Sequence, residues 1–288
     1  MRAWGRSASK VTTGREIDPE LIVAFCAAHP IETALMAEPV QTLRWSGALG
    51  ESVLVARAPG TGGELSAVCW IGGNIVPVGF TPEQLDELAG RIRRRGRRFS
   101  SIVGPADQVL GLWERLRDQR WPVREIRSDQ PSLLIDHDPI VPPDPSVRPA
   151  TMAEFDLLLP AAVAMFTEEV GYSPLGVAGA YERRVRELIA GGRSLVRIDD
   201  GPRGREVVFK ADLGTLGFGV TQVQGVWIHP AYRGRSLAAP AVSAVIEYAR
   251  RQIAPTVSLY VNSYNGRALA TYERVGFERI GTFASVLF

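Results

Sequence analysis

A proline-rich segment divides this chain of 288 residues into two halves of similar length. The segment covers residues 138–146 with the sequence DPIVPPDPS, and proline fixes φ and removes a backbone donor. Such a run favours an extended spacer over a helix or a central strand. Because each half has about 140 residues, the size of a typical domain, we expect two domains, 1–140 and 146–288, joined by a linker at 141–145.

Apolar periodicity in the second half predicts an α/β layer fold. The clearest element is a helix over 237–253, where Val242, Val245 and Ile246 belong to one apolar stripe. The predicted elements of this half are a strand at 147–149, helices at 151–170 and 177–190, strands at 194–198, 206–212 and 221–229, the helix at 237–253, a strand at 256–261, a helix at 265–275 and a strand at 277–288.

The first half repeats this order of elements without a close sequence repeat. Its most distinct start signal is Thr81-Pro82-Glu83-Gln84, which combines an N-cap, a proline in the first helical turn and a capping-box partner. We therefore expect two α/β domains, each with a mixed sheet flanked by helices. The predicted elements are helices at 19–28 and 31–37, strands at 51–58, 65–71 and 74–80, a helix at 82–95, a strand at 100–103, a helix at 106–118 and a strand at 132–135.

Composition excludes several classes of function. The formal net charge is +2, which gives no support for a nucleic-acid partner, and no apolar run reaches the roughly 20 residues of a membrane span. Cys26 and Cys69 form no CxxC pair, and His29, His137 and His229 show no metal-ligand spacing. We expect a cytoplasmic protein that binds no metal, no membrane and no nucleic acid.

The stretch QVQGVWIHPAYRGRSLA at residues 222–238 is typical of an anion site. It reads as a strand, a basic loop and the start of a helix, whose first turn offers free N–H groups and the positive end of the helix dipole. Small residues at Gly234 and Ser236 let an anion approach the backbone, and Arg233 and Arg235 add charge. The sequence therefore predicts a phosphate site in this loop.

This loop resembles the Arg/Gln-x-x-Gly-x-Gly/Ala signature of the GNAT (GCN5-related N-acetyltransferase) superfamily, aligned as Arg233-x-x-Ser236-x-Ala238. A second block, LYVNSYNGRALATYERVGF at residues 259–277, is similar to the family's strand–Asn-x-x-Ala–Tyr-Glu-x-x-Gly-Phe block. Together they imply a GNAT fold for residues 146–288. The first half resembles the degenerate first module of tandem GNAT proteins of the mycothiol synthase type. Its stretch GFTPEQ at 79–84 has no basic residue, so we expect no CoA site there.

The resemblance implies acetyl-CoA as the acyl donor and assigns roles to individual residues. Tyr272 matches the tyrosine that acts as general acid on the leaving thiolate, although it also fits a core aromatic. Asn265 matches a position that contacts the cofactor arm, and it is equally suited to cap the next helix. The implied cofactor-binding residues are Val226, Trp227 and Ile228 on the strand, Arg233, Gly234, Arg235, Ser236, Leu237 and Ala238 in the loop, and Asn265.

The general base is less evident. Gln222 and Gln224 lie where some members carry a glutamate, and an amide cannot accept the proton. Glu168, Glu169 and Tyr172 are the nearest candidates, because their segment borders the acceptor site in the family. A solvated helix end, a water relay and an acceptor amine that is already neutral remain open alternatives.

The predicted function is transfer of an acetyl group from acetyl-CoA to a small-molecule or peptide amine by direct attack in a ternary complex. One alternative is a CoA-binding sensor with little turnover, because Ser236 replaces the usual glycine and no base is evident. Another is a transferase of the same fold that uses aminoacyl-tRNA, which needs a basic groove. The arginine-rich run at 91–98 is expected to be a solvated helix end.

Overall fold

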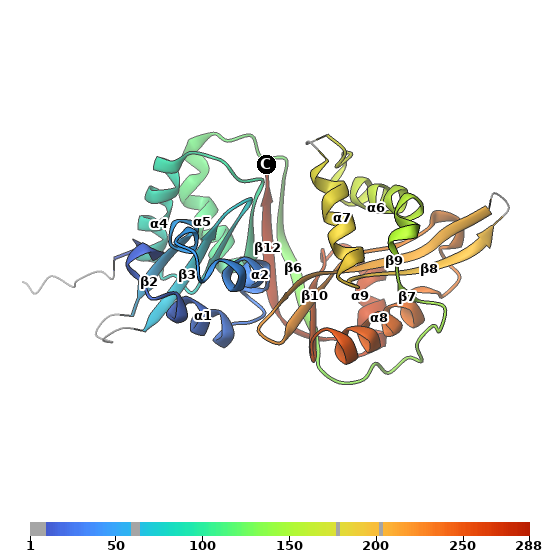
Figure 1. Cartoon of the computed structure of the whole chain (residues 1–288). Coiled ribbons are helices and arrows are strands. Elements are labelled where there is room, and N and C mark those ends of the chain that lie inside the picture. The colour runs from blue at the N-terminus through green and yellow to red at the C-terminus, as the bar shows by residue number, and fades with distance from the viewer. Residues whose placement is uncertain (1–9, 59–63, 177–178, 202–203) are drawn as a thin grey trace, which may run out of the picture. The chain divides into compact units, whose positions relative to one another are not determined.

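The computed structural model describes residues 10–58, 64–176, 179–201 and 204–288 (Figure 1). They form two compact units, and neither is one continuous piece of chain. Unit 1 contains Met1–Ser132, Tyr260–Tyr264 and Ile280–Phe288, and unit 2 contains Leu133–Leu259 and Asn265–Arg279. The proline-rich segment 138–146 thus lies within unit 2, and the predicted linker at 141–145 stays a prediction.

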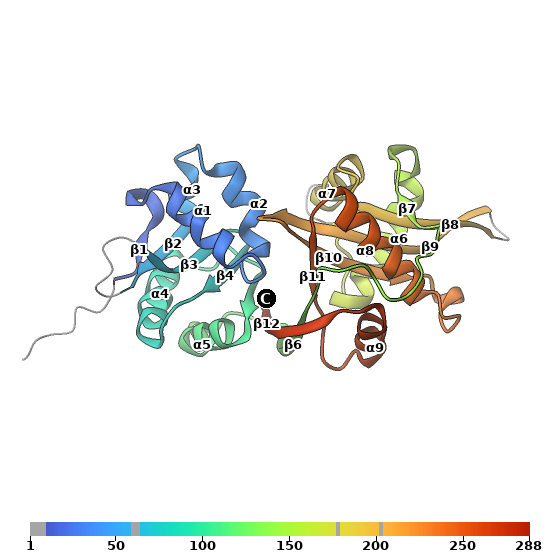
Figure 2. The same cartoon turned by 90° about the horizontal axis from the view of Figure 1, so that it is seen from below.

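Unit 1 has helices on both faces of a mixed sheet (Figures 1 and 2). The sheet order is β1-β2-β3-β4-β5-β12-β6, with α1 and α2 on one face and α4 and α5 on the other. The elements are β1 (Thr12–Thr13), α1 (Pro19–Ala28), α2 (Ala34–Leu43), α3 (Ala48–Ser52), β2 (Val53–Arg57), β3 (Leu65–Ile71), β4 (Asn74–Val78), α4 (Pro82–Arg95), β5 (Ser101–Pro105), α5 (Ala106–Leu116), β6 (Glu125–Ile135) and β12 (Glu278–Leu287).

The last strand of the chain is part of the core of unit 1. Residues 283–287 of β12 pair antiparallel with residues 101–105 of β5. Ala284 and Val286 point inward and are fully buried with the apolar faces of α4 and α5, among them Leu88 and Leu112. The alternation expected of a half-buried strand explains why this short segment completes the sheet.

Unit 2 has α6 and α7 on one face of its sheet and α8 on the other (Figures 1 and 2). Its strand order is β11-β10-β9-β8-β7, in which β10 and β11 are parallel while β7–β8, β8–β9 and β9–β10 are antiparallel. The elements are β7 (Arg148–Pro149), α6 (Phe155–Val170), α7 (Ala180–Ala190), β8 (Ser194–Gly201), β9 (Gly204–Gly217), β10 (Val220–Ile228), α8 (Ala238–Gln252), β11 (Thr256–Tyr260) and α9 (Gly266–Val275).

The predicted order of elements agrees with the structure except that β1 and α3 were not predicted, and several bounds differ. The predicted strand 51–58 begins at Val53, because Glu51 and Ser52 belong to α3. The predicted helix 31–37 begins later and runs on to Leu43, and the predicted strand 132–135 is the end of the longer β6. The residues at 125–130 are polar or charged except for the exposed Ile126, so no apolar run marked the first half of β6. Residues 177–178, where the predicted helix 177–190 begins, lie outside the described residues.

The proline-rich segment is attached to unit 2 by hydrogen bonds. The Ile140 and Asp144 N–H groups donate to the carbonyls of Val275 and Pro240, at 2.9 and 3.0 Å. The Asp144 carboxylate also accepts from Arg197 at 2.9 Å. Among the described residues, no helix combines the length and apolarity needed to cross a membrane.

Candidate active site

Strand β10 separates from β11 before its carboxyl end and forms a bulge against β9. Its register with β11 runs over three pairs, from Val220↔Thr256 to Gln222↔Ser258, and no later pair joins the described parts of these strands. On the other side, β9 pairs with Gln224 and next with Trp227, so two residues of β10 oppose one of β9. This β-bulge contains Gly225, whose φ is +56°, and it re-aims the backbone just before the basic loop.

The loop after β10 presents an open helix N-terminus. Gly234 and Ser236 have φ of +75° and +58°, a left-handed conformation that turns the chain sharply into α8. The N-cap residue Leu237 makes no side-chain capping hydrogen bond. The backbone N–H groups of the first turn are therefore left for a ligand, and Arg233 and Arg235 are exposed beside them.

Glu168, a predicted base, is instead held at this loop. Its carboxylate at the end of α6 accepts from the Trp227 indole at 3.1 Å and from the Arg233 guanidinium at 2.7 Å. Arg233 in turn donates through Nε to the Ile228 carbonyl at 2.9 Å. The structure thus brings Glu168, Trp227, Ile228 and Arg233 together, and the lone pairs of Glu168 are engaged by donors.

Tyr272 lies inside unit 2 on α9 and is 7% exposed. Burial raises the pKa of its hydroxyl above the ordinary value, and the negative charge of Glu169 raises it further. Burial likewise raises the pKa of Tyr181, followed by the charges of Asp212 and Glu169. The charge of Glu169, which is exposed at the end of α6, thus contributes to the raised pKa of both hydroxyls. A tyrosine whose proton is retained can serve as an acid.

The remaining predicted residues take the following places. Asn265 caps α9, because its Oδ1 accepts from the Ala268 N–H at 3.2 Å. Gln222 and Gln224 hydrogen-bond to each other at 3.0 Å, and their amides offer no base. Val226 follows Gly225 in the bulge, and Tyr172 packs edge-on against Phe166. The cofactor-binding and catalytic roles of all these residues stay predictions.

Sequence reasoning missed a buried charged network beneath the bulge. Lys210 on β9 is 1% exposed, and its ammonium donates to Asp212 at 2.6 Å and to the Gly225 carbonyl at 3.3 Å. The other carboxylate oxygen of Asp212 accepts from the Ser194 hydroxyl at 2.7 Å. One signal was present: Lys210 is one of two lysines among 33 basic residues, and it stands within an apolar strand.

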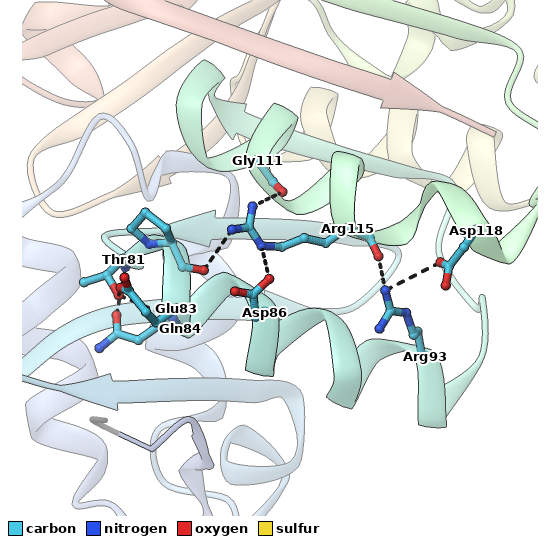
Figure 3. Close-up of polar contacts among 9 residues, drawn as sticks. Thr81, Glu83, Gln84, Asp86, Arg93, Gly111, Arg115 and Asp118 are labelled. Atoms are coloured by element: carbon cyan, nitrogen blue, oxygen red, sulfur yellow. Dashed lines mark hydrogen bonds and ion pairs between the residues drawn. The ribbon is translucent and has the colours of Figure 1, made fainter. Parts of the chain in front are cut away.

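Unit 1 has a helix N-terminus of the opposite kind, at the start of α4 (Figure 3). Thr81 and Gln84 form a complete capping box, with the Gln84 N–H donating to Thr81 Oγ1 at 3.3 Å and the Thr81 N–H to Gln84 Oε1 at 2.9 Å. The pKa of Glu83 is lowered, chiefly by its own backbone N–H and then by the Thr81 hydroxyl. The Glu83 carboxylate thus already lies in the first turn of α4, where a bound anion would otherwise be favoured.

The same face of α4 is tied to α5 by arginine side chains (Figure 3). Arg115 donates to Asp86 at 2.6 Å and to the Pro82 carbonyl at 3.0 Å. Arg93 donates to the Arg115 carbonyl and lies 3.5 Å from Asp118. Both arginines are therefore engaged by acceptors within this helix pair.

Comparison with known families gives two matches. Residues 144–277 match the acetyltransferase (GNAT) family, and residues 56–158 match a domain of unknown function (DUF4081). Mycothiol acetyltransferase of Mycolicibacterium paratuberculosis (strain ATCC BAA-968 / K-10) is 34% identical over 175 residues, which cover 54% of this chain and 54% of that protein. The aligned part thus spans about half the length of this relative.

Solved structures resemble the chain over nearly its whole length. A GCN5-related N-acetyltransferase from Sphaerobacter thermophilus covers 98% of the chain and 95% of its own, with a TM-score of 0.59 and 18% identity. A Drosophila protein covers 98% and 99%, with a TM-score of 0.61 and 14% identity. At these identities the likeness shows the fold, and the predicted α/β architecture of GNAT type is confirmed. Among the described residues, no cluster of three His, Cys, Asp or Glu could hold a metal.

Proposed function

From the premise that the C-terminal half belongs to the acetyltransferase (GNAT) family, we propose that this chain transfers an acetyl group from acetyl-CoA to an amine. The chain aligns with only about half of its curated relative, so we argue the activity from the geometry of the site and not from that relative's name. The observation that carries the proposal is the uncapped start of α8, preceded by the left-handed residues Gly234 and Ser236.

The chemistry of a pyrophosphate fits this loop. Several backbone N–H groups and the positive end of the α8 dipole favour an anion, and Arg233 and Arg235 supply two exposed cations. Arg235 also stacks over the Tyr232 ring at 5.1 Å, which holds it at the loop. The pantetheine arm would then follow β10 along Val226, Trp227 and Ile228, where β11 no longer pairs with it.

The proposed reaction is a direct transfer. The amine nitrogen attacks the thioester carbonyl carbon, the C–N bond forms, the C–S bond breaks, and the amine loses one proton. Tyr272, whose raised pKa keeps its hydroxyl protonated, supplies a proton to the departing thiolate. Backbone N–H groups stabilise the negative charge that develops on the carbonyl oxygen.

We assign the base to Glu169 rather than Glu168. Both stand at the exposed end of α6, and Glu168 is engaged by Trp227 and Arg233. The charge of Glu169 contributes to the raised pKa of both the Tyr181 and the Tyr272 hydroxyl, which supports a place for this carboxylate near the proposed site. The start of α4 in unit 1 is capped by its own side chains, and unit 1 is therefore proposed to bind no CoA. Its proposed role is to help select the acceptor or to support the other unit.

The proposal is tested first by binding. Calorimetry with CoA and with pantetheine, which lacks the pyrophosphate, should show tight binding of CoA by the wild-type chain and weak binding of pantetheine. Arg233→Gln combined with Arg235→Gln should weaken CoA at least tenfold and leave pantetheine unchanged, because only the pyrophosphate contacts are removed. Equal binding of CoA by the wild type and the double variant would contradict the phosphate role of the loop.

Turnover is tested next with a panel of acceptors. Thiol release from acetyl-CoA is followed with small amines, peptides and amines related to mycothiol, since the 34% identical relative carries that name. Wild type should accelerate release with at least one amine, and Glu169→Gln should lower the rate while Glu168→Gln should not. Tight CoA binding without release by any amine or by water would favour the sensor alternative, which the paired amides of Gln222 and Gln224 support.

A further inference from the structure

The bulge in β10 is held from below by a buried ammonium. Lys210 is paired in register with Trp227, so both side chains leave the sheet on the same face. The Lys210 Nζ lies 3.3 Å from the Gly225 carbonyl oxygen and 2.6 Å from Asp212 Oδ2. The Lys210 ammonium therefore holds the Gly225 carbonyl at the point where the regular pairing of β10 with β9 is interrupted.

Fixing this carbonyl also fixes the next N–H. The Gly225 carbonyl and the Val226 N–H belong to one planar peptide unit, in which the two groups point in opposite directions. With the oxygen drawn toward Lys210, the Val226 N–H is directed away from the ammonium. This residue stands on the part of β10 that is past its last pair with β11, where the acyl group is proposed to bind.

We propose that Lys210 is a positioning residue that orients the Gly225–Val226 peptide so that the Val226 N–H donates to the thioester carbonyl oxygen. The inference rests on the proposed function and adds to it a residue that no sequence motif marks. Lys210 does not touch the substrate, and it acts through the backbone.

The surroundings of Lys210 are consistent with a positioning role and not with a catalytic role. Its ammonium is 1% exposed, so it cannot exchange protons with an incoming amine. Asp212 balances the charge and is itself held by the Ser194 hydroxyl at 2.7 Å, which fixes the ammonium in place. An ammonium is a compact group with three donors, whereas a guanidinium is planar and larger, so one of the two lysines among the 33 basic residues of this chain fits here.

Glycine at position 225 is required by the same arrangement. Its φ of +56° is left-handed, and a Cβ there would lie 2.7 Å from Met165 Cε and 3.2 Å from Lys210 Nζ. A side chain there would force the ends of Met165 and Lys210 to move and would strain the left-handed backbone of this residue. Gly225 thus allows the bulge to form, and Lys210 sets the orientation of the Gly225–Val226 peptide.

The test compares two ligands that differ in one oxygen atom. Acetyl-CoA has the thioester carbonyl, and S-ethyl-CoA has a methylene in its place. Wild type should bind acetyl-CoA about fivefold more tightly, the worth of one hydrogen bond. In the variant Lys210→Met with Asp212→Asn, which removes both buried charges and keeps an acceptor for Ser194, this ratio should fall to about one while S-ethyl-CoA binds as before.

Two further variants serve as controls. Gly225→Ala keeps both charges and should lose the same discrimination, and Lys10→Met, which removes the other, exposed lysine, should retain it. Equal ratios in wild type and the Lys210 variant overturn the assignment, as does a variant that weakens both ligands equally or a wild type that does not discriminate. Failure of the wild type to bind either ligand instead removes the proposed function, and the inference with it.

Discussion

The guanidinium of Arg233 lies 2.7 Å from the carboxylate of Glu168, so the loop before α8 and the end of α6 are joined by an ion pair. Both side chains are nearly half exposed, at 44% and 46%, which places the pair among surface ion pairs worth at most about 1 kcal/mol. A pyrophosphate in the loop would compete with Glu168 for the same cation.

Glu168→Gln should therefore bind CoA more tightly, by about two- to fivefold at low salt, because the competing charge is removed. Calorimetric titration with CoA at low and high ionic strength checks this, and the gain should shrink as salt screens the pair. Asp156→Asn, an exposed change at the opposite end of α6, is the matched control and should leave the affinity unchanged. Weaker binding by Glu168→Gln would show that the carboxylate positions Arg233 rather than competing for it.

Substitutions at Ser236 should separate backbone shape from side-chain chemistry. Its φ of +58° is tolerated by serine and glycine and is poor for a β-branched residue. Ser236→Gly should keep both stability and CoA affinity, whereas Ser236→Val should lower the free energy of unfolding by about 1–2 kcal/mol and weaken CoA at least tenfold. Urea unfolding and CoA titration measure the two effects. Loss of CoA binding in Ser236→Gly would assign a direct contact to the hydroxyl.

Tyr272→Phe should lower kcat about a hundredfold and change the Kd for CoA less than twofold, as expected for loss of a general acid. Because burial and Glu169 raise the pKa of Tyr272, its proton is retained past its ordinary range, so the wild-type rate should show no loss from this group between pH 7 and about 10. Tyr248→Phe on α8 is the control. A Tyr272→Phe enzyme with the wild-type rate would make this side chain a core aromatic only.

Alkaline pH should destabilise unit 1 through its buried thiols. Burial raises the pKa of Cys26 from 9.0 to about 12, and burial also raises that of Cys69. The unfolded thiol loses its proton first, so stability is intact below pH 9 and falls as pH rises. At pH 10 the Cys26 contribution is a loss of about 1.4 kcal/mol, and Cys26→Ala should remove that much of the difference between pH 7 and pH 10 in urea unfolding. An unchanged difference would mean that the thiol ionises in the folded state as readily as in the unfolded state.

Local signals in the sequence were sufficient for the loop and for most elements. The loop before α8 could be located because small residues, cations and a helix start follow one another within residues 233–238, while its binding role stays a prediction. The capped start of α4 could be predicted for the same reason, since Thr81 and Gln84 are three residues apart.

Long-range partners could not be predicted. Periodicity places Lys210 within a strand but does not reveal that a register shift brings Gly225 above it, because the shift depends on the pairing of β9 with β10. Glu168 was expected near the acceptor, and its contacts with Trp227 and Arg233 depend on how α6 lies on the sheet. The pairing of β12 with β5 joins residues 180 positions apart, which no local pattern encodes.

That pairing bears on how the protein is made. Residues 1–132 leave the ribosome long before Ile280–Phe288, yet the sheet and core of unit 1 include Ala284 and Val286. The nascent N-terminal part must wait with the neighbouring edges of β5 and β6 unpaired until translation reaches β12, an interval in which exposed strand edges invite wrong partners. The N-terminal half, to which no chemistry is assigned, is therefore the part most exposed to misfolding during synthesis. A truncation at the proline-rich segment would remove β12 from the sheet of unit 1.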